Sequence, residues 1–330
     1  MKKFLKALKW FALSAITIII LFIVYALVKS DATYNAPYPE LTASTDSSVI
    51  ARGKYLIYGP AHCVDCHAPS SEHKLVEAGE IVALKGGNVF NLPIGNIYTP
   101  NITSDKETGI GTYTDGEIAR TLRYGIKKNG KALMDFMPFY DISDKDLTAI
   151  ISYLRTVPPV NNPVKEHEWN FLGKIVKAFG MIKPMGDANV PTSPEPDSTA
   201  EYGGYLAGSV ANCRGCHTER DMNTGAFIGP DYAGKMSFEM LDENSQIIKG
   251  KHIISANLTP DKETGRIYFW TEEDFIRRFR QGRIITGSPM PWGVFSRMSD
   301  RDLKALYKFL KSLKPIRSNT PAGVMDGNPG

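Results

Sequence analysis

The chain has 330 residues, of which 42% are hydrophobic and 22% charged; this composition is typical of a globular protein and excludes a disordered one. The length is sufficient for two domains of ordinary size. The net charge of +4 does not indicate nucleic-acid binding, because five lysines and no acid lie within residues 1–30, which leaves a net charge of −1 on the remainder.

Residues 1–30 are predicted to form a membrane anchor. Residues 10–28 are apolar and without charge, and a helix of this length, at about 1.5 Å per residue, spans the hydrocarbon core of about 30 Å. Four lysines precede it, which predicts a cytoplasmic amino end and a single-pass protein of a bacterial inner membrane with its soluble part in the periplasm. A signal peptide cleaved near Val24-Tyr25-Ala26 is the alternative, but the apolar run is longer than such peptides have.

A polar tether is predicted at 31–47, followed by the first of two repeats at 48–160. Each repeat carries one cysteine motif, Cys63-Val64-Asp65-Cys66-His67 and Cys213-Arg214-Gly215-Cys216-His217, and the sequence has no other cysteine. Cys-x-x-Cys-His is typical of covalent haem c attachment, in which both thiols bond to the haem and the histidine becomes an axial iron ligand. A redox dithiol, a disulfide and a zinc site are alternatives, but none of them explains the two histidines.

The rest of each repeat is duplicated as well. Asn101-Ile102-Thr103 matches Asn257-Leu258-Thr259 at an offset of 156, and the run DKETG occurs at both 105–109 and 261–265. The Asn-x-Thr triplets fit the pattern of glycosylation sites, but their repetition favours a shared surface loop that covers a haem edge.

Two helices are predicted after this loop in each repeat. Thr114 and Thr271 begin the first helix, each with an acid three residues later, and Ser143 and Ser299 begin the second. No alternating strand pattern is evident in either repeat, so an all-α fold is expected. Further matched pairs are Gly53 with Gly203, Arg120 with Arg277, Arg123 with Arg280, and Gly125 with Gly282.

Methionine is the predicted sixth iron ligand in both repeats, because a thioether favours ferrous iron. In the second repeat it is Met290, in a loop bounded by prolines. In the first repeat the offset of 156 assigns Met134, and Met137, which precedes Pro138, is the alternative. None of His62, His73, His167 and His252 has a counterpart in the other repeat, so we expect none to be a ligand; His62, beside Cys63, is the best placed to tune a haem.

A connector is predicted at 161–199, the second repeat at 200–318 and a tail at 319–330. Leu172, Ile175, Val176 and Phe179 have helical spacing, and residues 191–196 read as an extended linker. The amphipathic segment is expected to pack against a haem domain, with the membrane surface or a partner subunit as the alternative.

These motifs make the chain resemble tandem diheme class I cytochromes c, similar to the cytochrome subunits of bacterial membrane-bound alcohol, aldehyde and gluconate dehydrogenases. The resemblance implies two all-helical domains, each with its first and last helices crossing near Gly53 or Gly203. It also implies His67 with Met134, and His217 with Met290, as axial pairs. Those subunits typically have three haems and a C-terminal membrane attachment, whereas this sequence shows two motifs and an N-terminal apolar run.

The expected function is single-electron transfer through two covalently bound haem c groups, with no enzymatic activity of its own. The expected partners are redox proteins: a dehydrogenase, a quinol-oxidising complex or a terminal oxidase. The alternative is a diheme peroxidase-like enzyme, which requires one haem with a releasable axial ligand.

Overall fold

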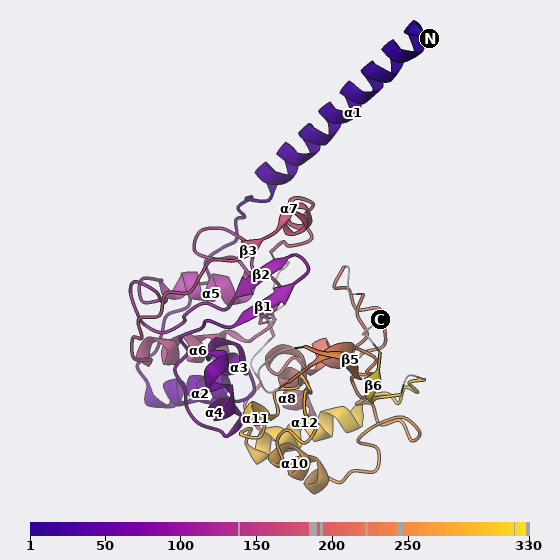
Figure 1. Cartoon of the computed structure of the whole chain (residues 1–330). Helices are drawn as coiled ribbons and strands as arrows, with labels where there is room; N and C mark the ends of the chain where they lie inside the picture. The colour runs from indigo at the N-terminus through magenta and orange to yellow at the C-terminus, as the bar shows by residue number, and fades with distance from the viewer. Residues whose placement is uncertain are drawn as a thin grey trace.

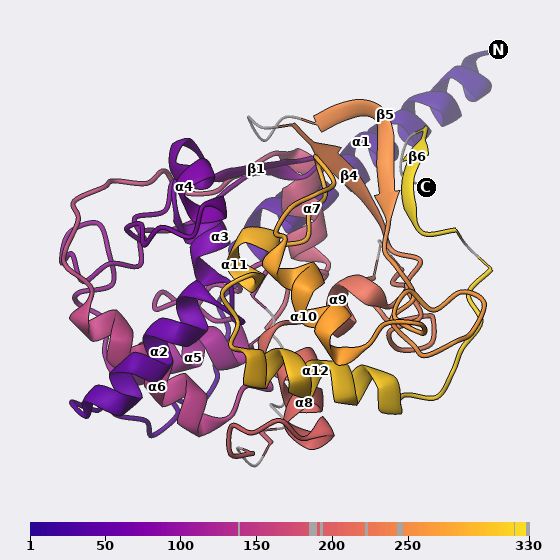
Figure 2. The same cartoon turned by 90° about the horizontal axis from the view of Figure 1, so that it is seen from below.

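The computed structural model describes residues 1–137, 139–184, 190–191, 194–221, 224–242, 247–319 and 321–327. One long helix, α1 (Lys2–Lys29), projects from a body formed by the rest of the chain (Figure 1). The body has an N-terminal half, residues 32–184, which adjoins α1, and a C-terminal half, residues 194–327, on the side away from α1 (Figure 1). Figure 2 shows the two halves side by side.

Helix α1 is the one helix in the described part of the chain that is long and apolar enough to cross a membrane. Its side chains are exposed apart from a few near its carboxyl end, where Ala26 is buried. The segment after it was expected to be a free tether, but it runs along the N-terminal half. The amides of Tyr34 and Ala43 donate to the Gly130 carbonyl at 2.8 Å and to the Asp115 carboxylate at 2.8 Å.

Both halves contain the same kinds of element in a similar order. The N-terminal half has α2 (Ser47–Tyr58), α3 (Cys63–His67), the 3₁₀ turn η1 (Ser70–Glu72), α4 (His73–Glu77), β1 (Val89–Leu92), β2 (Gly95–Tyr98), α5 (Asp115–Tyr124), α6 (Asp144–Thr156), β3 (Glu168–Trp169) and α7 (Phe171–Ala178). The C-terminal half has α8 (Ala200–Tyr205), the π-helical turn η2 (Leu206–Val210), α9 (Cys213–His217), β4 (Ser237–Leu241), β5 (Ile247–Ile254), α10 (Glu272–Arg280), α11 (Trp292–Phe295), α12 (Asp300–Ser312) and β6 (Gly323–Asp326).

The predicted helix starts are present in both halves. Thr114 and Thr271 each form a capping box with the acid three residues later, which satisfies two amides that have no partner within the helix. Ser143 and Ser299 each accept a hydrogen bond at 3.2 Å from the amide three residues later. These caps fix where α5, α6, α10 and α12 begin.

The expected helix crossing is also present in both halves. A Cβ atom on Gly53 of α2 would lie 1.9 Å from the carbonyl oxygen of Ala149 in α6, and one on Gly203 of α8 would lie 2.0 Å from that of Ala305 in α12. Only glycine allows two helices to approach this closely. The glycine pair found in the sequence therefore determines the main packing contact of each half.

The expectation of an all-α fold was incomplete, because each half also carries a three-stranded antiparallel sheet. Strand β2 lies between β1 and β3, and β5 lies between β4 and β6. Strands β1 to β3 have only two to four residues, too few for a clear alternating pattern. β3 and β6 come from segments that the sequence analysis assigned to the connector and the tail. Thr192 and Ser193, in the expected linker, lie outside the described residues.

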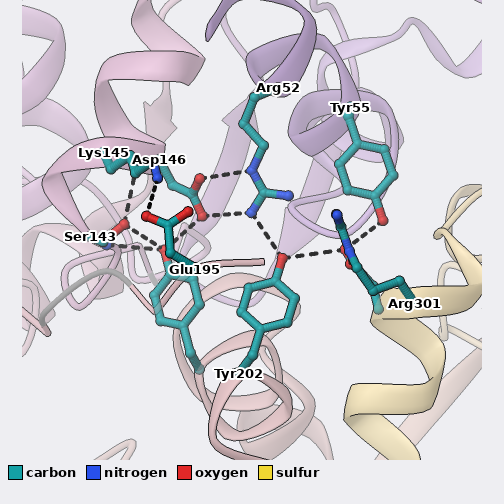
Figure 3. A network of polar contacts seen from close by, with 10 residues as sticks. Arg52, Tyr55, Ser143, Lys145, Asp146, Glu195, Tyr202 and Arg301 are labelled. Atoms are coloured by element: carbon teal, nitrogen blue, oxygen red, sulfur yellow. Dashed lines mark hydrogen bonds and ion pairs between the residues drawn. The ribbon is translucent and has the colours of Figure 1, made fainter. Parts of the chain in front are cut away.

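Tyrosine side chains join the two halves in a reciprocal manner (Figure 3). The Tyr55 hydroxyl of α2 donates to Asp302 of α12 at 2.7 Å and accepts from the Ser299 amide at 2.9 Å. The equivalent Tyr205 hydroxyl donates to Asp146 of α6 at 2.9 Å and accepts from the Ser143 amide at 3.2 Å. Each half thus supplies a hydroxyl to the start of the last helix of the other half.

An arginine completes this junction. Arg52 binds both carboxylate oxygens of Asp146 at 2.8 Å and donates to the Tyr202 hydroxyl at 3.1 Å (Figure 3). Burial disfavours its charge, but the hydrogen bonds and the negative charge of Asp146 outweigh that effect and raise the pKa of Arg52. Away from this network, Arg283 and Glu77 form a further ion pair between the halves at 2.8 Å.

Candidate haem-binding site

The two cysteine motifs have the same local structure. Each forms a one-turn helix, α3 or α9, and each follows a residue with left-handed backbone, His62 with φ 41° and Asn212 with φ 49°. The Asn212 side chain accepts a hydrogen bond from the Gly215 amide at 3.2 Å. The sharp entry into the helix places both cysteines and the histidine of each motif within a single turn.

Three of the four cysteines, Cys63, Cys66 and Cys213, are half-buried, and Cys216 is exposed. Burial raises the pKa of Cys63, Cys66 and Cys213 to about 12, and it raises the pKa of Cys216 as well. Thiols that hold their protons so firmly are poor thiolate ligands and poor redox nucleophiles. Among the described residues no group of three or more His, Cys, Asp or Glu side chains is arranged to hold a metal ion, so the zinc alternative has no support.

Both motif histidines are oriented by a backbone carbonyl. Nδ1 of His67 lies 2.9 Å from the Pro100 oxygen, and Nδ1 of His217 lies 2.8 Å from the Ala256 oxygen. A carbonyl only accepts, so Nδ1 carries the proton and Nε2 is left with a free lone pair. Burial also lowers the pKa of both rings, which keeps them neutral. A neutral imidazole with a free Nε2 is the form that ligates iron.

The duplicated loops supply these carbonyls. Asn101 follows Pro100 and donates from its side chain to the Val160 carbonyl at 2.8 Å; Asn257 follows Ala256 and donates to the Ile316 carbonyl at 2.7 Å. Both asparagines are buried, so they are not available to a glycosylating enzyme. The repeated loop occupies an equivalent place in both halves, and it also orients the motif histidine, which the sequence did not reveal.

A cavity of about 280 Å³ lies against α3 in the N-terminal half. Cys63, Cys66 and His67 form part of its wall, and both candidate methionines, Met134 and Met137, lie on its wall too. Much of the remaining lining is apolar and comes from α2, β2, α5, α6 and the loops that follow α2, Pro100 and α5: Ile57, Ala61, Ile97, Ile102, Ile110, Ile118, Leu122, Leu133, Phe139, Ile150 and Leu154.

The methionine loops share a backbone frame at the offset of 156. The Phe136 amide donates to the Met134 carbonyl at 2.7 Å, as the Trp292 amide donates to the Met290 carbonyl at 2.8 Å. The Phe139 amide also donates to the Met137 carbonyl, at 2.9 Å, so this hydrogen bond occurs at both candidates and the offset alone favours Met134. Packing supports the alternative, because Met137, like Met290, packs against the apolar core. Pro138 lies outside the described residues.

An arginine of the preceding helix, α5 or α10, anchors the end of each methionine loop. Arg123 is buried and donates to the carbonyls of Tyr140 and Ile142 at 3.1 and 2.5 Å. Arg280 donates to the equivalent carbonyls of Ser296 and Met298 at 2.5 and 2.7 Å. The sequence analysis paired these arginines without giving them a role. Their equivalent positions, two residues before a glycine in each repeat, were the sequence feature that could have indicated it.

The other histidines occupy different surroundings. His62 is next to Cys63 on the cavity wall, and its ring lies 5.5 Å from that of Phe295 in the other half. His167 is also on the cavity wall, where Nε2 contacts Lys127 Nζ at 3.0 Å. His73 pairs with Asp65 at 3.5 Å, and His252 contacts the Gly327 carbonyl at 3.1 Å.

Comparison with known proteins identifies the type of domain. Residues 205–314 match the cytochrome c family model. The chain is a relative of bacterial cytochrome c subunits. It is 30% identical over 282 residues to the gluconate 2-dehydrogenase cytochrome c subunit of Pantoea cypripedii, which covers 81% of this chain and 60% of that protein.

Two other relatives are also cytochrome subunits of dehydrogenases. The alcohol dehydrogenase (quinone) cytochrome c subunit of Gluconacetobacter polyoxogenes is 29% identical over 300 residues, covering 83% of this chain and 58% of the relative. The fructose dehydrogenase cytochrome subunit of Gluconobacter japonicus is 28% identical over 295 residues, covering 84% and 55%. The chain therefore spans a little over half the length of these cytochromes.

The residues present fit the haem c that the cytochrome c family binds covalently. A pair of cysteine thiols that can form thioethers, a neutral histidine with a free Nε2 and methionines on the wall of an apolar cavity are the groups that would hold such a haem. When bound, the haem supplies an iron that changes oxidation state by one electron. The protein holds the histidine in one tautomer through Pro100 or Ala256, and in the N-terminal half apolar side chains would surround a bound haem.

Proposed function

We propose that the chain is a membrane-anchored diheme cytochrome that transfers single electrons at the periplasmic face of a bacterial inner membrane. The observation that carries the proposal is the repeated histidine geometry. In both halves the motif histidine donates from Nδ1 to a loop carbonyl at 2.8 to 2.9 Å and presents Nε2 for a metal. Two equivalent sites imply two haems.

The tandem arrangement at residues 48–160 and 200–318 is part of this proposal. The family model covers the second range. Support for the first comes from the matching crossing glycine, helix caps, loop asparagine and anchoring arginine described above. The strands lie between or after the helices of each half. The cysteine-motif helix, the duplicated loop and the methionine loop follow one another in the same order in both halves.

The proposed covalent attachment residues are Cys63 and Cys66 for one haem, and Cys213 and Cys216 for the other. His67 and His217 are the proposed axial ligands on one side. On the other side we assign Met290 to the second haem and, by the offset of 156, Met134 to the first. The packing of Met137 against the core makes it the competing candidate.

Electron transfer fits these sites better than catalysis at the haem. A haem held by histidine and methionine has no free coordination position for a substrate, and its ligands need little rearrangement when the iron changes oxidation state. The relatives are named as cytochrome subunits of dehydrogenases, so we propose a dehydrogenase as electron donor and a quinol-oxidising complex or terminal oxidase as a further partner.

The membrane anchor is proposed for residues 10–28 of α1. These residues are apolar and exposed to the surroundings, and the lysines before them favour a cytoplasmic amino end. Recovery of the haem-loaded full chain in carbonate-washed membranes is the expected result. Release into the soluble fraction with the amino terminus missing would favour the cleaved signal peptide instead.

The ligand assignment is tested by single methionine substitutions in the haem-loaded full chain. Met290→Ala should remove the sulfur-to-iron absorption band of one haem, and Met134→Ala that of the other, with Met137→Ala as the matched variant. If Met137→Ala removes the band while Met134→Ala keeps it, the first assignment passes to Met137. Rapid carbon monoxide binding to both haems of the unmodified ferrous protein would contradict electron transfer and favour the peroxidase-like alternative.

A further inference from the structure

Helix α7 and the residues after it expose a group of large apolar side chains. Phe171, Leu172, Phe179 and Met181 are 48%, 51%, 57% and 55% exposed. We call residues 171–181 the interfacial segment. The sequence analysis expected it to pack against a haem domain, and Gly173 does pack closely against the Ile94 carbonyl. The four apolar side chains, however, remain largely uncovered by the body.

The interfacial segment lies against the carboxyl end of α1 (Figure 1). The Phe179 ring is 6.1 Å from the Phe22 ring and 5.8 Å from the Tyr25 ring. Phe22 lies six residues before Val28, where the apolar run ends, and six residues of helix correspond to about 9 Å. If α1 crosses a bilayer, Phe179 therefore lies below the level at which the run ends, at the depth that amphipathic helices reach when they bind a membrane surface.

Lysines lie near this apolar group. Lys174 and Lys177 lie on α7, and Lys127 and Lys131 lie close enough to Lys177 for their positive charges to repel it. Asp31, just after α1, pairs with Lys131 at 2.6 Å and so ties the end of α1 to the cluster. Lysines beside exposed apolar side chains are typical of segments that bind anionic lipid headgroups.

We propose that the interfacial segment lies in the headgroup layer of an anionic bilayer, with Phe171, Leu172, Phe179 and Met181 inserted and Lys174 and Lys177 at the phosphates. The inference rests on the proposed membrane anchor, because α1 sets the depth. Strand β3 directly precedes α7 and pairs with β2, whose Ile97 and Tyr98 line the cavity. The membrane contact therefore fixes the N-terminal cavity on the bilayer side and the C-terminal half farther out (Figure 1).

The test uses the haem-loaded full chain in vesicles of phosphatidylcholine with phosphatidylglycerol. A nitroxide side chain is placed by non-natural amino acid incorporation at residue 172, at residue 18 of α1, or at residue 269, where Phe269 is 78% exposed in the C-terminal half. Collisions with oxygen report the apolar phase, and collisions with a nickel chelate report water. We expect the ratio of oxygen to nickel collisions at 172 to exceed that at 269 several-fold and to fall below that at 18.

Each result decides the proposal. A ratio at 172 equal to that at 269, with 18 still in the apolar phase, overturns the membrane contact and leaves the anchor intact; the segment would then be free for a protein partner. A water-exposed label at residue 18 overturns both the membrane anchor and the membrane contact of the interfacial segment. Lys174→Gln with Lys177→Gln should lower the ratio at 172 in the mixed vesicles to its value in phosphatidylcholine alone, whereas Lys308→Gln, on the exposed surface of α12, should not. An unchanged ratio in the double variant overturns the role of anionic lipid.

Discussion

Asp146 and Asp302 occupy equivalent positions in the two halves of the molecule, but different groups compensate their charges. Asp146 binds Arg52, which lies on α2 of its own half, whereas Asp302 is 3.2 Å from its neighbour Arg301. The residue equivalent to Arg52 is Tyr202, and these two side chains touch at 3.1 Å. Position 52 in one half and its equivalent, position 202, in the other half lie side by side at the junction. Arginine at both positions would therefore place two cations in contact.

The tyrosines show the opposite case. Tyr55 and Tyr205 each reach into the other half and bind its carboxylate without meeting one another. Because these two side chains do not touch, having the same residue at both positions causes no repulsion, and both are tyrosine. The comparison indicates that two equivalent charged residues must differ where they contact each other. Equivalent residues can stay the same where each contacts a different group in the other half.

The largest expected effect comes from removing the cysteines of one half. Cys63→Ser with Cys66→Ser should give a protein with one covalent haem instead of two, because the C-terminal attachment site is complete without the first. Cys213→Ser with Cys216→Ser is the matched variant. Haem staining and the pyridine haemochrome spectrum measure the loss. Absence of all covalent haem from either variant would show that the halves do not mature independently.

Arg52→Met should be the most destabilising single substitution at the junction. It leaves the Asp146 carboxylate buried without its cation, a change that costs about 3–5 kcal/mol, and denaturant unfolding of the haem-loaded protein measures the loss. The exposed pair of Lys145 with Glu195, 2.6 Å apart, is the control, and Lys145→Ala should cost about 0–1 kcal/mol. Equal losses from the two variants would refute the role given to Arg52.

Substitution of the crossing glycines should destabilise both halves to a similar degree. Gly53→Ala and Gly203→Ala each place a methyl group about 2 Å from a carbonyl oxygen of the partner helix, and overpacking of this kind costs about 1–3 kcal/mol. Gly208→Ala is the control, because a Cβ atom there has no described neighbour within 4 Å. If only one of the two substitutions lowered the free energy of unfolding, the two helix crossings would not be equivalent.

The smallest effect is expected from Tyr55→Phe and Tyr205→Phe. Burial raises the pKa of both phenols, so each keeps the proton that it donates. Each variant loses the hydrogen bond donated to a buried carboxylate and the one accepted from a serine amide, which should reduce the free energy of unfolding by about 1–2 kcal/mol in each case. Tyr98→Phe, whose hydroxyl binds the exposed Glu168, should leave the unfolding transition unchanged. Markedly unequal losses at Tyr55 and Tyr205 would show that the junction is not reciprocal.

Much of the frame was predictable from the sequence because it depends on local rules. Helix caps such as Thr114 and Ser143, and the glycine of each crossing, have fixed spacings that appear twice. Strands β1 to β3 were missed because two to four residues show no period, and the burial of the longer β5 does not alternate regularly along the strand. Strands β3 and β6 also join sheets with residues far away in the chain. The roles of Arg52 and Tyr55 depend on how the two halves meet, which no local pattern records.

At the haem sites the sequence predicted the attachment chemistry of the motif. It did not predict the backbone carbonyls that orient the motif histidines. The Cys-x-x-Cys-His spacing indicated attachment, but the carbonyls of Pro100 and Ala256 that orient the histidines belong to loops over thirty residues away. The methionine loop is intermediate. Its position follows from spacing, whereas the choice between Met134 and Met137 depends on packing that spacing does not describe.

The intact mass of the denatured full chain tests the central claim most directly, because thioether-bound haem remains attached after unfolding. We expect the mass of the polypeptide plus two haems, with both haems lost only when both cysteine pairs are replaced. A mass corresponding to one haem or none, in a protein matured where the haem-attachment machinery is active, would contradict the account of two equivalent sites.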